Sequence, residues 1–154
     1  MKIPLTLRKY SEGVKPYCAL HFSYDPPYGR KSRGHVDAFV DTGSSFTSIC
    51  QTDAKRLSLV PTATPRQIRI GGSLVNYHPV QHSSVKVICD DKTTIYDVSI
   101  PTVYVTLPIP NNARSLECAP YLPSIIGTDF LIQNKLALYF DPARGIAYLE
   151  NPEK

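Results

Sequence analysis

The sequence predicts an all-β protein, either a barrel or a sandwich, and three observations lead to that fold class. Fourteen prolines and eight glycines interrupt the 154 residues at short intervals. The runs between them are short and rich in Val, Ile, Thr and Tyr, which is typical of strands. No repeat, low-complexity stretch or linker divides the sequence, so we expect one domain over residues 1–154.

The expected strands show alternating apolar and polar residues and end at turn-forming residues. Residues 25–34 hold two prolines and two glycines, which predicts a hairpin loop. His21 and His35 flank that loop and are expected to face each other across the hairpin. Residues 141–145 are expected to form the turn of a terminal hairpin. The predicted strands are residues 17–24, 35–40, 48–50, 67–70, 75–77, 80–89, 94–100, 102–107, 136–140 and 146–149.

Two short helices are expected between these strands. Residues 51–57 fit a helix with Thr52 as its cap, and residues 129–134 fit another with Thr128 as its cap. Residues 108–123 contain four prolines and predict a loop. That loop is long for a compact domain, so we expect it to be functional or mobile.

Composition excludes several classes of protein. Apolar residues make up 42% of the chain and charged residues 19%, which argues against disorder. The net charge of +4 is too small to indicate a nucleic-acid-binding protein, and basic residues cluster only at Arg30, Lys31 and Arg33. No apolar run reaches the length of a membrane helix, and the first residues do not resemble a signal peptide. We therefore expect a cytoplasmic location and no membrane partner.

The four cysteines are expected to be reduced and mostly buried. Cys18, Cys50, Cys89 and Cys118 are widely spaced and form no C-x-x-C pair. The alternative is that an even number of cysteines forms disulfides if the protein is exported. None lies near another cysteine in sequence, so no metal site and no cofactor are expected.

One segment carries a chemical signal, because an apolar strand leads directly into Asp41. A carboxylate beside a buried strand is costly unless hydrogen bonds stabilise it. Thr42 and Ser44 supply hydroxyl groups, and Gly43 permits close approach of the backbone. The alternative is an ordinary turn, since these residue types favour turns on their own.

Two further segments strengthen the first. Residues 124–131 place two β-branched apolar residues and a glycine before a short helix, and residues 70–73 contain a Gly-Gly pair. Together with the Asp-Thr-Gly-Ser segment, they resemble the retropepsin-like aspartic proteases. The resemblance covers nearly the whole chain. It implies a closed β-barrel of the acid-protease type that assembles as a C2 homodimer.

The resemblance also implies the catalytic mechanism. Aspartic proteolysis needs two carboxylates that share one proton, and the chain has a single Asp-Thr-Gly. Asp41 would therefore pair with Asp41 of a second copy to activate a water molecule against an extended peptide. Thr42 would hold the two loops together, Gly43 would allow close approach, and Ser44 would donate to the Asp41 carboxylate. That last hydrogen bond would favour the ionised form and predicts an acidic pH optimum.

The same resemblance assigns a flap. Ile70, Gly71, Gly72 and Ser73 would form its tip and close over the peptide, which would bind as an added strand.

Three further residues complete the expected site. Ile126 would be an apolar residue near the substrate. Gly127 would allow close packing under the catalytic loop. Asp129 is expected to be structural, because it lies in the first turn of a helix.

Two functions remain open at this point. The first is an active homodimeric endopeptidase. The second is a non-catalytic dimerisation or peptide-binding module with the same fold, although such a module has no evident need for a buried pair of carboxylates.

Overall fold

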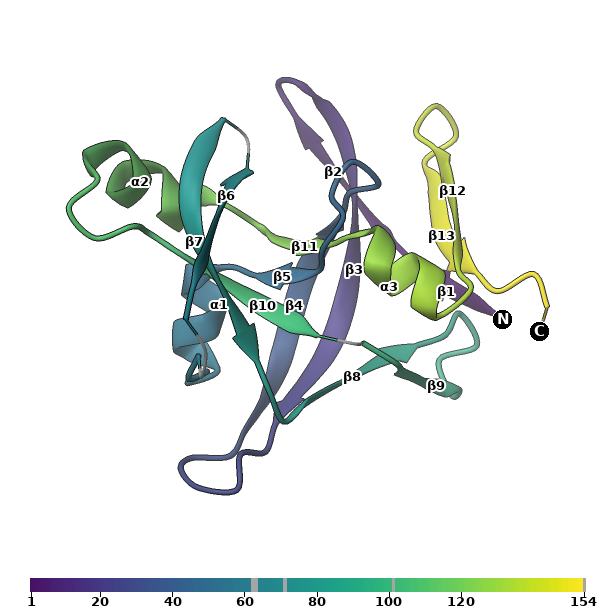
Figure 1. Ribbon diagram of the computed structural model, residues 1–154. Coiled ribbons are helices and arrows are strands. Elements are labelled where there is room, and N and C mark those ends of the chain that lie inside the picture. The colour runs from purple at the N-terminus through teal and green to yellow at the C-terminus, as the bar shows by residue number, and fades with distance from the viewer. Residues whose placement is uncertain (62–63, 71, 101, 154) are drawn as a thin grey trace.

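The computed structural model describes residues 1–61, 64–70, 72–100 and 102–153, which form two β-sheets and a few short helices (Figure 1). The all-β prediction is therefore confirmed at the level of mostly β structure. The strands are β1 (Lys2–Pro4), β2 (Thr6–Tyr10), β3 (Gly13–Tyr24), β4 (Ser32–Val40), β5 (Ser48–Ile49), β6 (Arg66–Ile70), β7 (Ser73–Val80), β8 (Ser83–Ile88), β9 (Ile95–Val98), β10 (Val103–Leu107), β11 (Ser124–Ile126), β12 (Ala137–Asp141) and β13 (Ile146–Glu150). The helices are α1 (Gln51–Arg56), α2 (Ala113–Cys118), the 3₁₀ turn η1 (Ala119–Tyr121) and α3 (Thr128–Gln133).

The larger sheet has the strand order β6-β7-β10-β5-β11-β4-β3-β8-β9, and β2 pairs with β3. Closing this sheet into a barrel would require its two end strands to pair. Within the described ranges, β6 pairs only with β7 and β9 only with β8, so the sheet is open. The prediction of a closed barrel is not met. Each end strand is half of a hairpin, so its only strand partner among the described residues is its neighbour in that hairpin.

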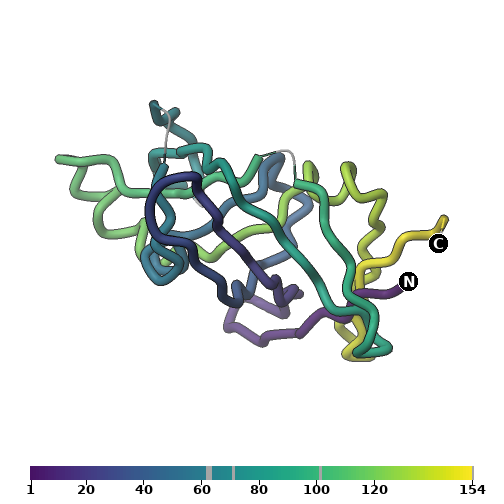
Figure 2. The backbone as a smooth tube through the Cα atoms, turned by 90° about the horizontal axis from the view of Figure 1, so that it is seen from below, coloured from purple at the N-terminus to yellow at the C-terminus, as the bar shows by residue number. Residues whose placement is uncertain are grey.

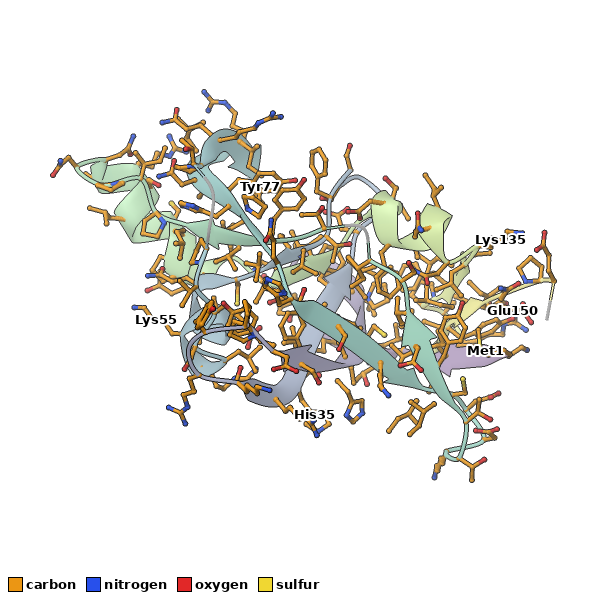
Figure 3. The ribbon with its side chains drawn as sticks, turned by 60° about the horizontal axis from the view of Figure 1, so that its bottom comes forward. Met1, His35, Lys55, Tyr77, Lys135 and Glu150 are labelled. Carbon is orange, nitrogen blue, oxygen red and sulfur yellow. The ribbon has the colours of Figure 1, made fainter. Side chains whose placement is uncertain are left out.

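The smaller sheet joins the two ends of the chain. Strand β1 pairs antiparallel with β13, and β13 pairs with β12. The predicted terminal hairpin is thus confirmed, whereas β1 and β2 were not predicted. The N- and C-termini lie at the same end of the molecule (Figure 2), where Met1 and Glu150 are also labelled in Figure 3.

The core lies between the inward faces of the larger sheet and helices α1 and α3. Leu20 and Phe22 of β3 and Val36 of β4 are at most 1% exposed, and Phe130 of α3 is fully buried. Each such side chain contributes about 1.5–3 kcal/mol to folding through the removal of apolar surface from water. Alternation along β3 leaves His21 and Ser23 on the outer face, and the His21 and His35 rings meet at 4.2 Å between centroids, as predicted.

The helices differ from the sequence prediction in their caps and in number. The residues before α1 and α3 are Cys50 and Gly127, so Thr52 and Thr128 are not caps. Residues 108–123 are not a plain loop, because they contain α2 and η1. Helix α2 begins where the Asn112 side chain accepts a hydrogen bond from the Ser115 amide, an N-cap signal that the prolines obscured.

All four cysteines are free thiols, which agrees with the prediction of reduced cysteines. Cys18, Cys50 and Cys89 are buried, and Cys118 is half-buried. Burial raises the pKa of the Cys18 thiol to about 12, so it stays protonated and unreactive near neutral pH.

Candidate active site

Asp41 follows β4 directly, in a loop that crosses the end of another strand. Strand β11 lies between β4 and β5, parallel to β4 and antiparallel to β5. Residues 41–47, which connect β4 to β5 and which we call the Asp41 loop, must therefore pass over the end of β11 (Figure 1). This arrangement brings the second predicted segment, residues 124–131, under the first.

Backbone hydrogen bonds fix the Asp41 loop to that segment. The Asp41 amide donates to the Ile126 carbonyl at 3.0 Å, and the Thr128 amide donates to the Ser44 carbonyl at 2.8 Å. The Ser44 amide in turn donates to the Asp41 carbonyl at 3.1 Å. The backbone that carries Asp41 is thus held from both sides, which is the rigidity that a catalytic group requires.

The Asp41 carboxylate is only partly engaged. The Gly43 amide donates to its Oδ1 atom at 2.9 Å, and no described residue donates to Oδ2. Asp41 is half-buried, while Thr42 and Gly43 are exposed. One carboxylate oxygen of this fixed loop therefore has no donor among the described residues and can accept a hydrogen bond from a water molecule or a second carboxyl group.

Ser44 does not have its expected partner. Its hydroxyl donates to the Phe46 carbonyl at 2.9 Å instead of to Asp41. The expectation of a Ser44–Asp41 hydrogen bond is thus corrected: the donor to the carboxylate is the Gly43 amide. The hydroxyl stabilises the turn of the loop instead.

Gly127 lies directly beneath the Asp41 loop. A Cβ atom at this position would come within 2.5 Å of the Phe46 carbonyl carbon and oxygen. No side chain could fit there without moving the loop. The close packing predicted for Gly127 is therefore present in the structure.

Thr47 and Asp129 form a hydrogen-bonded clamp between the Asp41 loop and α3. The sequence predicted only the structural role of Asp129 and gave no role to Thr47. Thr47 is 1% exposed, and its amide and hydroxyl donate to Asp129 Oδ2 and Oδ1 at 3.0 and 2.7 Å. The Thr47 hydroxyl also accepts from the Gly127 amide at 3.1 Å, and the Phe130 amide donates to Asp129 Oδ1. Both Asp129 oxygens are thus occupied, which agrees with a structural residue. No local signal marks Thr47, because its partners are 80 residues or more away.

The residues predicted to form a flap belong to the hairpin of β6 and β7. In this β6–β7 hairpin Ile70 is opposite Ser73, and Gly72 has a φ of +80° that favours glycine. Gly71 lies outside the described residues. Ser73 is buried at the base of the turn, and the Ile126 side chain is fully buried in the core and lines no open surface.

Three aromatic rings connect the β6–β7 hairpin to the Asp41 loop. Tyr77 of β7 stacks on Tyr104 of β10 with ring centroids 3.8 Å apart, and Phe46 lies 5.3 Å from Tyr77. Phe46 is 44% exposed, which leaves an apolar surface beside the loop. Burial raises the pKa of the Tyr77 phenol, and its hydroxyl has no hydrogen-bond partner among the described residues. The sequence did not indicate this cluster, since the three residues come from separate strands and a loop.

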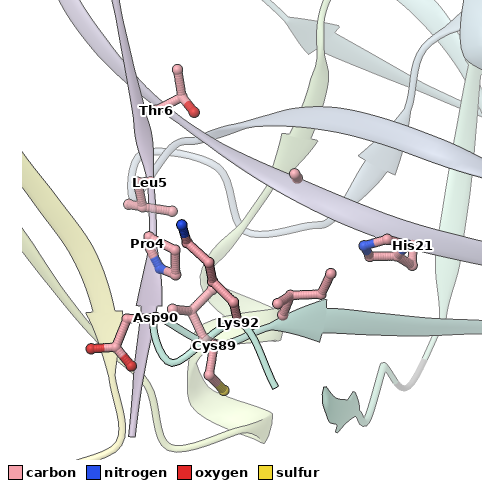
Figure 4. Close-up of a pocket in the computed structure, with 10 residues that line it drawn as sticks. Pro4, Leu5, Thr6, His21, Cys89, Asp90 and Lys92 are labelled. Carbon is pink, nitrogen blue, oxygen red and sulfur yellow. The ribbon is translucent and has the colours of Figure 1, made fainter. Parts of the chain in front are cut away.

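Other sites are less favoured. Among the described residues, no group of three His, Cys, Asp or Glu side chains could hold a metal ion. A cavity of about 350 Å³ lies elsewhere, between the N-terminal strands and the end of β8, where Leu5, Cys89 and Lys92 line it (Figure 4). No residue of the Asp41 loop contributes to it.

In the described part of the chain, none of the helices has the length and apolar character needed to cross a bilayer.

Comparison with known proteins agrees with this geometry. A profile of aspartyl protease sequences matches residues 31–130, a range that contains the Asp41 loop, the β6–β7 hairpin and Gly127. The chain belongs to the aspartyl protease family. Among solved structures, a retropepsin-like aspartic protease from Rickettsia conorii is similar to it, with a TM-score of 0.51 and 17% identity over 97% of each chain. No curated protein matches the sequence.

This likeness shows a shared fold across the whole chain, including the terminal sheet and the segments that the profile does not cover. The retropepsin-like family predicted from the sequence is thus confirmed.

Proposed function

We propose that this aspartyl protease is a homodimeric endopeptidase in which Asp41 of two copies activates water against a peptide bond. The observation that carries the proposal is the state of the Asp41 carboxylate: Oδ1 accepts from the Gly43 amide, while Oδ2 has no partner within the described residues. A rigid loop presents this group, and the profile match supports its chemistry.

The second carboxylate must come from another chain. The sequence has one Asp-Thr-Gly, and the other acidic residue tied to the loop is Asp129. Asp129 is unsuitable because both of its oxygens accept structural hydrogen bonds. A two-fold axis beside the exposed Thr42 and Gly43 would bring two Asp41 side chains together.

The reaction then follows from a pair of carboxyl groups that shares one proton. The ionised carboxylate takes a proton from water, the water oxygen bonds to the peptide carbonyl carbon, and the protonated carboxyl donates to the carbonyl oxygen. The carboxyl that took the proton from water then donates it to the nitrogen, while the other carboxylate takes a proton from one hydroxyl of the intermediate. The C–N bond breaks, which releases an amine and a carboxylic acid and restores the singly protonated pair. Two carboxyl groups share a proton at acidic pH, so we expect activity to peak below neutrality.

The substrate would be an extended peptide. Strand β6 is an end strand of the larger sheet and belongs to the β6–β7 hairpin, the proposed flap, so it can pair with an added strand. The exposed ring of Phe46, which packs against Tyr77 and Tyr104, gives an apolar surface beside the loop. We therefore expect a preference for apolar side chains next to the cleaved bond.

The test is cleavage of a denatured protein mixture from pH 3 to 8, with size-exclusion chromatography to determine the oligomeric state. Wild type should cleave at acidic pH as a dimer, and pepstatin should inhibit it. Asp41→Asn should abolish cleavage, with a loss of about a thousandfold or more, since the mechanism needs an ionisable pair. Asp91→Asn, an equal change in an exposed turn, is the matched control and should retain activity.

Two outcomes would overturn the proposal. Cleavage that survives Asp41→Asn would mean that another group carries the chemistry. A dimer without cleavage at any pH would favour the non-catalytic peptide-binding module.

A further inference from the structure

The basic cluster noted in the sequence is not part of the Asp41 site. Arg33 lies near the start of β4 and Asp41 follows its other end, so the length of the strand separates them. The loop that carries Lys31 is at the bottom of Figure 1, opposite the Asp41 loop. Any role of these cations is therefore separate from peptide cleavage.

A polar cavity of about 460 Å³ lies at this end of the sheet. Lys31, Arg33 and Lys86 line it together with Ser23 and Ser84. The strand register explains the grouping, since Ser23 pairs with Arg33 on one side and with Ser84 on the other. Arg33, Ser23 and Ser84 thus form a row across β4, β3 and β8 on the outer face of the sheet.

The polar groups of this row are available. Within the described ranges, the Arg33 guanidinium and the Ser23 and Ser84 hydroxyls have no side-chain hydrogen bond or ion pair. Ser32 also lines the cavity, but its hydroxyl already donates to the Leu57 carbonyl. The row therefore offers one unpaired planar cation and two hydroxyl donors.

The two lysines are held only by exposed ion pairs. Lys31 lies 2.9 Å from Asp25, and Lys86 lies 3.2 Å from Asp97, with both partners of each pair largely exposed. Such pairs contribute little, so either ammonium group can turn towards an incoming anion. Asp25 also lines the cavity, and its charge leaves a net excess of positive charge there.

We propose that this cavity binds a small phosphate-bearing molecule, with the Arg33 guanidinium as the central contact. A guanidinium binds two oxygens of a phosphate side by side, and hydroxyl and ammonium donors can satisfy the others. A monocarboxylate would use fewer of these donors. The volume exceeds that of one phosphate, which leaves room for a second phosphoryl group or a small attached group.

The test is titration of ¹⁵N-labelled protein at constant ionic strength with three probes: inorganic phosphate, pyrophosphate and succinate. Phosphate should produce saturable amide shifts at Ser23, Arg33 and Ser84. Pyrophosphate should bind at least as tightly, and succinate, a dianion of different shape, should bind more weakly. Tighter binding of pyrophosphate than of phosphate would show that the cavity accommodates a second phosphoryl group.

Variants locate the site. Arg33→Gln should weaken phosphate binding about tenfold, the effect of losing one charge-assisted contact. Arg33→Lys keeps the charge without the planar fork and should fall between wild type and Arg33→Gln. Arg114→Gln makes the same charge change at an exposed position on α2 and is the matched control. It should leave binding unchanged.

Three results would overturn the inference. They are the absence of saturable shifts, succinate binding as tight as phosphate, and equal weakening by Arg33→Gln and Arg114→Gln. Each would mean that only general surface charge attracts the anion. Because the readout is binding and not cleavage, the result is independent of the proposed protease activity.

Discussion

Two aspartates of this chain begin turns with similar local chemistry but different surroundings. In the Asp41 turn, the amide of the residue two positions later donates to Oδ1 at 2.9 Å. In the Asp91 turn, between β8 and β9, the Thr93 amide donates to Oδ1 at the same distance. Asp91 then gains the Thr94 amide and the Thr94 hydroxyl, whereas Asp41 gains no second donor within the described residues.

The difference is between a carboxylate whose two oxygens both accept hydrogen bonds and a carboxylate with one oxygen left unpaired. Hydrogen bonds from the Thr94 hydroxyl and from the Thr94 and Thr93 amides lower the pKa of Asp91 to about 2. Both oxygens of Asp91 are engaged by residues that follow it at once. The Asp41 loop is held instead by Ile126, Gly127 and Thr128, which leaves one oxygen of its carboxylate open.

The largest effect is expected from a substitution at Gly127, which packs beneath the Asp41 loop although it is far from it in sequence. In Gly127→Ala, the new Cβ would meet the Phe46 backbone at 2.5 Å, and backbone cannot rotate away. We expect the free energy of unfolding to fall by about 3 kcal/mol or more, and cleavage to be lost. Urea unfolding and the cleavage assay measure both effects.

Gly34→Ala is the matched comparison. Its Cβ would approach Leu57 Cδ2 at 2.8 Å and an Arg56 nitrogen at 3.0 Å, both at the ends of flexible side chains. The loss of stability should be clearly smaller than for Gly127→Ala. Equal losses of stability in the two variants would show that the contact between Gly127 and the Phe46 backbone is no more restrictive than a contact with flexible side chains.

The next effect concerns the clamp between Thr47 and Asp129. Thr47→Val removes the hydroxyl, so Asp129 Oδ1 loses a donor and the Gly127 amide loses its acceptor. Leaving buried polar groups unpaired should cost about 1–3 kcal/mol of stability and reduce cleavage. Thr47→Ser retains the hydroxyl and should recover most of both. If Thr47→Val and Thr47→Ser lose the same stability and cleavage activity, the hydrogen bonds of the Thr47 hydroxyl do not support the loop.

A third carboxylate, that of Asp53, extends the comparison to the pH dependence of stability. Asp53 accepts from Ser124 Oγ and from Arg56, both at 2.7 Å. Burial opposes ionisation, but hydrogen bonds from Arg56, Ser124 and Cys50 outweigh it and lower the pKa of Asp53 below its ordinary 3.8. Because the folded-state pKa is the lower one, this stabilisation is present above pH 4 and is lost as the pH falls through the folded value.

Asp53→Asn should therefore reduce stability at pH 7 by about 1–3 kcal/mol and flatten the acid limb of the stability curve. Chemical denaturation of wild type and variant between pH 2 and 7 measures this. Curves that stay parallel over that range would contradict the assignment of the lowered pKa to Asp53.

The smallest effect is expected at the Asp91 turn. Asp91 is exposed, and its partners lie within three residues in the chain. Asp91→Asn keeps an acceptor for the Thr93 and Thr94 amides, so the melting temperature should change less than in Asp53→Asn. Thermal unfolding monitored by circular dichroism measures this change. A larger change than in Asp53→Asn would mean that Asp91 stabilises more of the molecule than its own turn.

The sequence by itself determined the features that depend on neighbouring residues. The β class, the hairpin around residues 25–34 and the terminal hairpin all follow from local alternation and turn chemistry. The Asp-Thr-Gly-Ser segment and the apolar pair before Gly127 were sufficient to predict the family.

Only the tertiary structure decided how these pieces support one another. Nothing near Asp41 in sequence shows that β11 inserts between β4 and β5, or that Thr47 meets Asp129 across 82 residues. The open sheet, the Ser44–Phe46 hydrogen bond and the burial of Ile126 were missed for the same reason. A residue pattern reports the conformation of its own segment, whereas hydrogen-bond partners and packing depend on which distant segments the fold brings into contact.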